Sequence, residues 1–184
     1  MPANPTSSPT RALSHAASDG QARMVDVGDK PVSDRSATAE GFVRVSHELA
    51  AAIEANTIKK GSVLEVARLA GILAAKRTDE LIPLCHTLPL DAVDVSATLT
   101  PPTAGEVRRR VRIVASVRTR SRTGVEMEAL TAVSIACLTV MDMGKAIDKA
   151  MVIEGVRVLE KHGGRSGSYL ATGATPESRT GVER

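Results

Sequence analysis

The charged residues that border the longest uncharged stretch of the chain are the strongest candidates for chemistry. Thirteen residues, Ala129 to Met141, carry no formal charge and include no proline, which predicts a helix buried on nearly every face. Glu126 and Glu128 precede this stretch, and Asp142 and Lys145 follow it. Uncompensated charge is costly in an interior, so a functional role is the favoured interpretation. The alternative is that Asp142 and Lys145 form a surface pair on an exposed last turn.

The length of this helix limits how its two ends can act. Glu128 and Asp142 are 14 residues apart, which is roughly 21 Å along a continuous helix. They cannot both contact one small substrate within one chain. If they share a site, that site lies at a subunit interface, where the start of the helix in one protomer meets the far end of the same helix in its partner.

Lys60 is a second candidate because of the residues that follow it. Gly61 lets the backbone approach a ligand closely, and Ser62 with Glu65 forms a capping box that marks a helix start. The dipole of that helix would favour a nearby anion. The alternative is a solvated loop lysine.

Cys85 and His86 lie between two prolines in the apolar connection Leu81–Leu90, which should be ordered but not helical. A zinc site needs about four ligands with a recognisable spacing, so no metal site is predicted. A Cys–His nucleophilic pair is also disfavoured, because adjacency in sequence is not the required geometry. A His86 that binds a polar ligand or transfers protons is more plausible, and a hydrogen-bonded core histidine is the alternative.

Two further features could attract anions. Gly163–Gly167, with Lys161 before it, could bind phosphate through backbone N–H groups, although glycine turns are common in any chain. Arginines alternate along Arg108–Arg122 and could form an electrostatic landing surface. Such a row is more often the solvated side of a sheet.

The order of the elements predicts an α+β fold. The polar stretch Asp26–Thr38 is expected to be a loop. A strand that alternates apolar and polar residues is expected at Val107–Val117. If the chain stays extended as far as Glu126 and Glu128, both carboxylates would point to the polar side of that strand. The sequence therefore predicts a doubled split β-α-β unit, an antiparallel sheet with helices on one face. The expected elements are a strand at Gly41–Val45, a helix capped by Ser46 at His47–Asn56, a helix from Val63 to Lys76–Arg77, a hairpin at Val93–Leu99 and Val107–Val117, the central helix, and a last strand at Met151–Leu159.

Composition limits the class of protein. The 184 residues are 42% apolar and 24% charged, with a net charge of +3, as in an ordinary globular protein. Residues 24–167 are predicted to form one domain between disordered tails at 1–23 and 168–184. No signal peptide or membrane span is visible. The two cysteines indicate a reducing, cytoplasmic setting rather than a disulfide framework.

Taken together, the motifs resemble those of the MoaC family, the cyclic pyranopterin monophosphate synthases of molybdenum cofactor biosynthesis. The resemblance covers about Met24 to Gly167 and is highly specific, since several long motifs occur in the right order. They are Met24–Val27, the Lys60–Gly61 pair, Ala74–Thr78, Leu81–His86, Thr123–Thr131, Asp142–Ala146 and Gly163–Gly167.

The resemblance implies a ferredoxin-like fold and a homohexamer built as a trimer of dimers, with the active site at the dimer interface. It implies a lyase whose substrate is (8S)-3',8-cyclo-7,8-dihydroguanosine 5'-triphosphate, made by a radical SAM partner enzyme. The products would be cyclic pyranopterin monophosphate and pyrophosphate. No cofactor is required, although Mg²⁺ can accompany the triphosphate. Neither a nucleic acid nor a membrane is an expected partner.

By matching motif, the resemblance also implies roles for single residues. The catalytic residues would be Asp142, Lys145 and Lys60. The substrate-binding residues would be Leu84, Cys85, His86, Met127, Glu128, Glu126, Arg35 and Lys161. Enclosure would lower the lysine pKa values, so that the two lysines, beside Asp142 and His86, act as general acids and bases.

The alternative from another class is a non-catalytic ferredoxin-like module that binds RNA or a regulatory ligand. RNA-binding modules of this type stack bases on exposed aromatic side chains. The only aromatic residues here are Phe42 and Tyr169, and neither lies in the predicted hairpin. This alternative also leaves the charges at the helix ends without a role.

Overall fold

One antiparallel sheet organises the protein. The structure is a computed structural model that describes residues 21–102, 104–165 and 167–174. The strands run in the order β2-β3-β1-β4-β5 across the sheet. They are β1 (Ser33–Ser46), β2 (Ala92–Leu99), β3 (Arg108–Ser121), β4 (Val152–His162) and β5 (Tyr169–Leu170). The helices are α1 (His47–Glu54), α2 (Val63–Ala75), α3 (Thr78–Leu81) and α4 (Glu126–Gly144).

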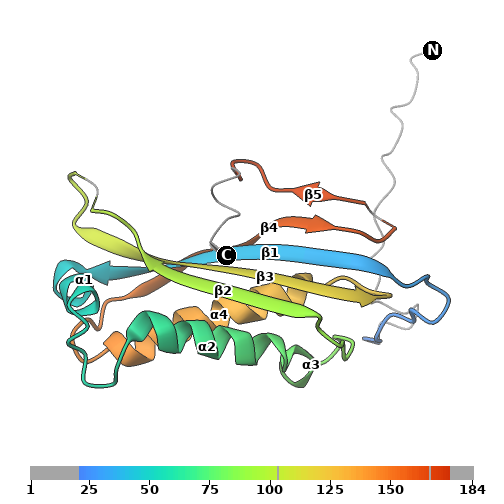
Figure 1. Ribbon diagram of the computed structural model, residues 1–184, viewed down its shortest axis with the longest axis horizontal. Coiled ribbons are helices and arrows are strands. Elements are labelled where there is room, and N and C mark those ends of the chain that lie inside the picture. Colours follow the sequence, from blue (N-terminus) through green and yellow to red (C-terminus); the bar gives the residue numbers. More distant parts are fainter. Residues whose placement is uncertain (1–20, 103, 166, 175–184) are drawn as a thin grey trace, which may run out of the picture.

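The predicted β-α-β-β-α-β order is confirmed, and so is the α+β, ferredoxin-like arrangement. The two long helices, α2 and α4, cover the same face of the sheet (Figure 1). The predicted hairpin is β2 paired with β3, from Ala92 opposite Arg118 to Leu99 opposite Val111. Alternating apolar residues on these strands are therefore turned toward the helices.

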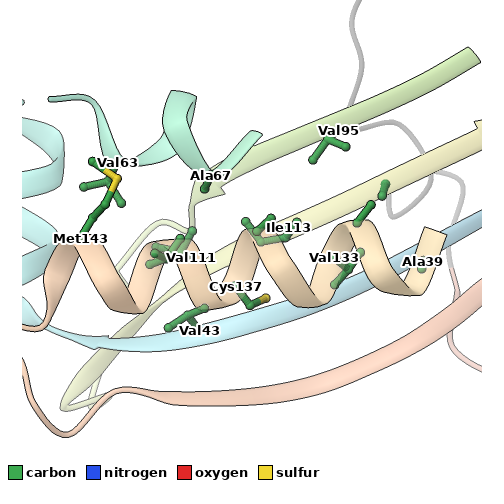
Figure 2. Packing of buried hydrophobic residues seen from close by; sticks show 14 of the residues in the cluster. Ala39, Val43, Val63, Ala67, Val95, Val111, Ile113, Val133, Cys137 and Met143 are labelled. Atoms are coloured by element: carbon green, nitrogen blue, oxygen red, sulfur yellow. The ribbon is translucent and has the colours of Figure 1, made fainter. Parts of the chain in front are cut away.

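The core is aliphatic, as the near absence of aromatic residues requires. Val43 of β1 and Val111 and Ile113 of β3 are fully buried against α4. Figure 2 shows these side chains between the strands and α4, which contributes Val133 and Cys137 from its buried side. Burial of each such side chain stabilises the fold by about 1.5–3 kcal/mol.

The predicted helix starts are also confirmed. Ser46 caps α1, its side chain accepting a hydrogen bond from the Leu49 N–H at 3.1 Å. Ser62 caps α2 in the same way, through the Glu65 N–H at 3.4 Å. Each cap satisfies a backbone donor that the helix itself leaves without a partner.

The prediction of a loop from Asp26 to Thr38 was wrong in its second half, because β1 begins at Ser33. Ser33 pairs with Ser121 of β3, and Thr38 pairs with both Ser116 of β3 and Glu160 of β4. A central strand receives hydrogen bonds from both sides. Those bonds override the weak strand propensity of a polar segment.

The chain does not stay extended as far as Glu126 and Glu128, so the condition for both carboxylates to lie on the polar side is not met. Strand β3 ends at Ser121, and α4 begins at Glu126. The change from strand to helix turns the Glu128 side chain inward, and Glu128 is only 4% exposed. A helical period of 3.6 places Glu126 and Glu128 on different faces, whereas a strand would have placed them on the same face.

The sheet continues beyond Gly167, because Tyr169 and Leu170 pair with Lys161 and Glu160. Of the predicted tails at 1–23 and 168–184, residues 1–20 and 175–184 lie outside the described residues. Helix α4 is long and apolar enough for a membrane span, but 56% of that stretch is buried inside the protein as the central helix of the core.

The arginine row of β3 is largely paired on the face of the sheet that lacks helices. Arg112 donates to Glu40 at 2.9 Å, and Glu40 also accepts from Arg157 at 2.9 Å. Arg110 pairs with Glu154 at 3.0 Å. The row is therefore mainly a set of cross-strand ion pairs rather than a free basic surface.

Candidate active site

Three predicted catalytic residues meet where α4 ends. The Lys60 and Lys145 ammonium groups donate to opposite oxygens of the Asp142 carboxylate, at 2.8 and 2.7 Å. Lys60 also donates to the Asp142 carbonyl at 3.1 Å. These contacts, first Lys145 and then Lys60, lower the pKa of Asp142 to about 2. We call this group the lysine–aspartate cluster.

The lysine–aspartate cluster is open to solvent in the single chain. The side chains of Lys60, Asp142 and Lys145 are 52%, 57% and 66% exposed. The predicted enclosure of the lysines is therefore not provided by the chain that carries them. An exposed ion pair is worth little to stability, so the arrangement has no obvious structural purpose.

Local backbone geometry brings Lys60 to the end of α4. The connection between α1 and α2 turns at Asn56, whose φ is 51°, and at Gly61, whose φ is 98°. Helix α1 itself packs on the α4 terminus: a Cβ at Gly144 would lie 2.6 Å from a Leu49 methyl. Glycine is thus required for this close approach.

A pocket of about 390 Å³ lies at the opposite end of α4 and contains the predicted substrate-binding segments. We call it the entrance pocket. His86 donates from Nε2 to the Val25 carbonyl at 2.7 Å, since a carbonyl can only accept. Its Nδ1 is then the ring nitrogen that can exchange a proton with a ligand. The predicted residues that line this pocket are Leu84, Cys85, His86, Glu126, Met127 and Glu128.

Glu128 is the buried carboxyl group of the entrance pocket. Burial raises its pKa to about 7, its own backbone N–H opposes the rise, and Glu126 and Asp79 add to it. Burial also raises the pKa of the Cys85 thiol, which disfavours a thiolate nucleophile. Near neutral pH, Glu128 can therefore either donate or accept a proton.

A larger cavity of about 1090 Å³ adjoins the entrance pocket and shares Lys30, Thr123, Gly124 and Glu126 with it. We call it the cationic cavity, because five cationic side chains face three carboxylates in its lining. The cations are Lys30, Arg35, Arg122, Lys161 and Arg165, and the carboxylates are Asp26, Asp29 and Glu126. Such a lining suits a polyphosphate.

Arg35 is held in the cationic cavity by backbone groups. It donates to the carbonyls of Ser121 and Arg122, each at 3.0 Å. Gly164 lies directly against its guanidinium: a Cβ there would be 2.1 Å from Nη1. Lys161 pairs with Glu126 at 2.8 Å, which links β4 to the start of α4.

Known proteins resemble this chain over most of its length. The sequence pattern of the MoaC family matches residues 24–164. This chain belongs to the MoaC family. A cyclic pyranopterin monophosphate synthase of Methylobacterium sp. (strain 4-46) is 54% identical over 160 residues, 87% of this chain and 97% of that relative. The protein of the same name from Cereibacter sphaeroides (strain KD131 / KCTC 12085) is 51% identical over 160 residues, 87% of this chain and 98% of that relative.

The family's predicted site residues fall into two groups in this MoaC-family chain. Lys60, Asp142 and Lys145 form one group, and the remaining predicted residues line the two adjoining cavities. The whole length of α4 separates them, so His86 is not beside Asp142 within one chain. No three histidine, cysteine or acidic side chains gather around a metal-sized space in residues 21–102, 104–165 and 167–174.

The helix that separates the two groups is not buried on nearly every face, contrary to the sequence prediction. Met127 near one end and Leu138 near the other are 39% and 52% exposed. The outer side of α2 adds Val66, Leu69 and Leu73, which are 39–59% exposed. This chain by itself therefore exposes an apolar helical surface between its two groups of site residues.

Sequence reasoning missed two cations of the cationic cavity. Lys30 was assigned to a loop, and Arg122 was treated as the last member of the arginine row. The available signal was position: Lys30 follows the Met24–Val27 motif, and Arg122 immediately precedes the Thr123–Thr131 motif.

Proposed function

We propose that this MoaC-family enzyme converts (8S)-3',8-cyclo-7,8-dihydroguanosine 5'-triphosphate to cyclic pyranopterin monophosphate, with release of pyrophosphate. This is an early step of molybdenum cofactor biosynthesis. The observation that carries the proposal is the Asp142 carboxylate held between the Lys60 and Lys145 ammonium groups. The relatives with 51–54% identity bear the name of this activity.

In this proposal each of the two adjoining cavities binds a different part of the substrate. The cationic cavity takes the triphosphate, because its lining carries an excess of positive charge. The entrance pocket takes the purine-derived ring, where the Glu128 carboxyl and the His86 ring can hydrogen-bond to it. Ring opening and reclosure require repeated proton transfers, which we assign to Lys60, Lys145 and Asp142.

The proposed active site contains two chains. An antiparallel partner would bring its lysine–aspartate cluster over the entrance pocket of the first chain. Two observations support this arrangement: the lysine–aspartate cluster is open in one chain, and an apolar surface lies between the two ends of α4. Covering that surface would enclose both lysines and remove apolar area from water.

The remaining parts of the proposal concern partners and setting. The dimers assemble as a homohexamer in the cytoplasm, and a radical SAM enzyme supplies the cyclised nucleotide. The reaction needs no resident cofactor, and Mg²⁺ enters with the triphosphate as part of the substrate. The alternative of an RNA-binding module is disfavoured because carboxylates pair with Arg110 and Arg112 on the open sheet face.

The direct test supplies the purified protein with the cyclised nucleotide and measures two products. Pyrophosphate and the pterin product should appear in equal amounts. The same protein given GTP should release neither. Retention of RNA without turnover of the cyclised nucleotide would support the alternative module instead.

A further inference from the structure

Asp148 is a buried carboxylate just beyond α4 that the proposed reaction does not use. Its side chain is 4% exposed. Oδ2 accepts from the Ser46 N–H at 2.7 Å and from Arg108 Nη1 at 2.8 Å, and Oδ1 accepts from the Ala150 N–H at 2.9 Å and from Arg108 Nη2 at 3.3 Å. Burial alone would raise the pKa of Asp148, but the bonds from Arg108, Ala150 and Ser46 hold it below its ordinary value.

These contacts join two segments that lead to the lysine–aspartate cluster. Ser46 caps α1, and the connection after α1 carries Lys60. Asp148 itself lies three residues after Lys145, and its N–H and that of Ile147 both donate to the Gly144 carbonyl, at 3.0 and 2.9 Å. The Asp148 carboxylate therefore connects the start of α1 to the residues that follow α4.

The end of the sheet where α1 lies is also the end where α4 terminates (Figure 1). The Leu49 side chain also packs against Gly144 and so links α1 to the α4 terminus. Such an apolar contact fixes the distance between the two helices, but it does not fix their relative orientation as directional hydrogen bonds do. The exposed ends of Lys60 and Lys145 gain no orientation from packing, because more than half of each is in solvent.

We propose that Asp148 is a positioning residue for the proposed reaction: by bonding Ser46, Arg108 and Ala150 together, it holds Lys60 and Lys145 on either side of Asp142. This role rests on the proposed function of the lysine–aspartate cluster. Asp148 does not touch the substrate. It acts through the geometry of the other three residues, and errors of about 1 Å in such geometry can reduce turnover about a hundredfold.

A buried carboxylate can also be purely structural, and the protein supplies a matched control. Glu40 is 5% exposed and pairs with Arg112 and Arg157 at the middle of β1, away from α1 and the end of α4. Asp148→Asn and Glu40→Gln make the same chemical change at equal burial. Only the first change lies beside the lysine–aspartate cluster.

The test measures the pKa of Asp142 by carboxyl ¹³C NMR, which needs no substrate. In Asp148→Asn the pKa should rise from about 2 toward the ordinary 3.8, because the two lysines lose their fixed approach. Glu40→Gln should leave it unchanged. If Asp148→Asn does not fold, Asp148→Glu replaces it, because the charge stays but the longer side chain moves the carboxylate away from the Ser46 and Ala150 N–H groups. An unchanged Asp142 pKa in the variant that folds would overturn the proposal.

Turnover gives a second readout, measured well below the melting temperature of each variant. Asp148→Asn should lower kcat about a hundredfold with a smaller change in KM, whereas Glu40→Gln should keep both. Equal losses in the two variants would show a merely structural role and overturn the proposal. If the wild type forms no product, the proposed function fails, and the Asp142 titration still decides whether Asp148 positions the lysines.

Discussion

The Lys60 ammonium lies 2.8 Å from the Asp142 carboxylate, although 82 residues separate the two in sequence. Both side chains are more than half exposed, so neither packing nor burial explains why they meet. Two segments converge at this point: the connection after α1, and the end of α4 with Lys145 as its C-cap residue. The convergence makes chemical sense if a substrate or a second chain covers it.

Replacing either lysine should abolish turnover without unfolding the protein. We expect Lys60→Ala and Lys145→Ala each to lower kcat about 10²- to 10⁴-fold, the usual contribution of general acid–base catalysis. The melting temperature should barely move, because both side chains are exposed. Lys59→Ala is the control, since it removes the neighbouring exposed lysine. Near-normal turnover in both variants would refute the catalytic assignment.

Stability should depend on pH through Glu128. Its pKa is about 7 in the folded protein against an ordinary 4.5, so the folded chain keeps a proton that the unfolded chain has released. The free energy of unfolding therefore falls as pH rises from about 4.5 to 7. Urea denaturation should show Glu128→Gln more stable than wild type at pH 8 by roughly 2 kcal/mol, allowing for partial solvent screening, and equal to it near pH 4.

Glu48→Gln serves as the control for that experiment, because Glu48 is an exposed carboxylate in the first turn of α1. It should show no stability gain at pH 8. A Glu128→Gln variant whose stability followed the wild-type pH dependence would contradict the assigned pKa.

Loss of the Glu40 carboxylate should destabilise the sheet. Glu40→Gln leaves Arg112 and Arg157 without their shared charge partner across β3, β1 and β4. Because the two arginines are 21% and 46% exposed, water screens the charge that is left, and the expected cost is about 1–2 kcal/mol. Glu106→Gln breaks the exposed Arg110 pair and should cost less than about 0.5 kcal/mol. Chemical denaturation of both variants compares them, and equal costs would contradict the prediction.

Substitution at Gly164 should weaken substrate binding through Arg35. A Cβ there would lie 2.1 Å from the guanidinium, and the φ of 79° is already strained for other residues. We expect Gly164→Ala to raise KM about tenfold, the cost of one misplaced charge-assisted hydrogen bond. Gly105→Ala carries similar backbone strain, at φ 81°, but nothing lies within 4 Å. Its KM should stay unchanged, and an equal rise in both variants would exclude the Arg35 explanation.

Local patterns were sufficient to predict much of the fold. The alternation in Val93–Leu99 predicts β2, and Ser46 and Ser62 predict two helix starts, because each signal lies within a few neighbouring residues. The first half of β1 escaped prediction because its pairing partners are about 90 residues away. The inward turn of Glu128 escaped because only the fold shows where β3 ends and α4 begins.

The candidate site was predictable in its residue types but not in its grouping. The motifs identified Asp142, Lys145 and Lys60, and the helix length predicted that Glu128 would lie far from them. Sequence spacing could not indicate Asp148, which looks like an ordinary charge after a helix. Its importance follows from Ser46 and Arg108, which are far from it along the chain.

Mixing two inactive variants tests the two-chain active site most directly. Asp142→Asn and Glu128→Gln should each be inactive alone, and they are combined under conditions in which subunits exchange. If one chain supplies Asp142 and its partner supplies Glu128, each mixed dimer contains one intact site, and the mixture should recover about a quarter of wild-type turnover. Complete absence of recovery, with subunit exchange confirmed by mass spectrometry, would contradict the account.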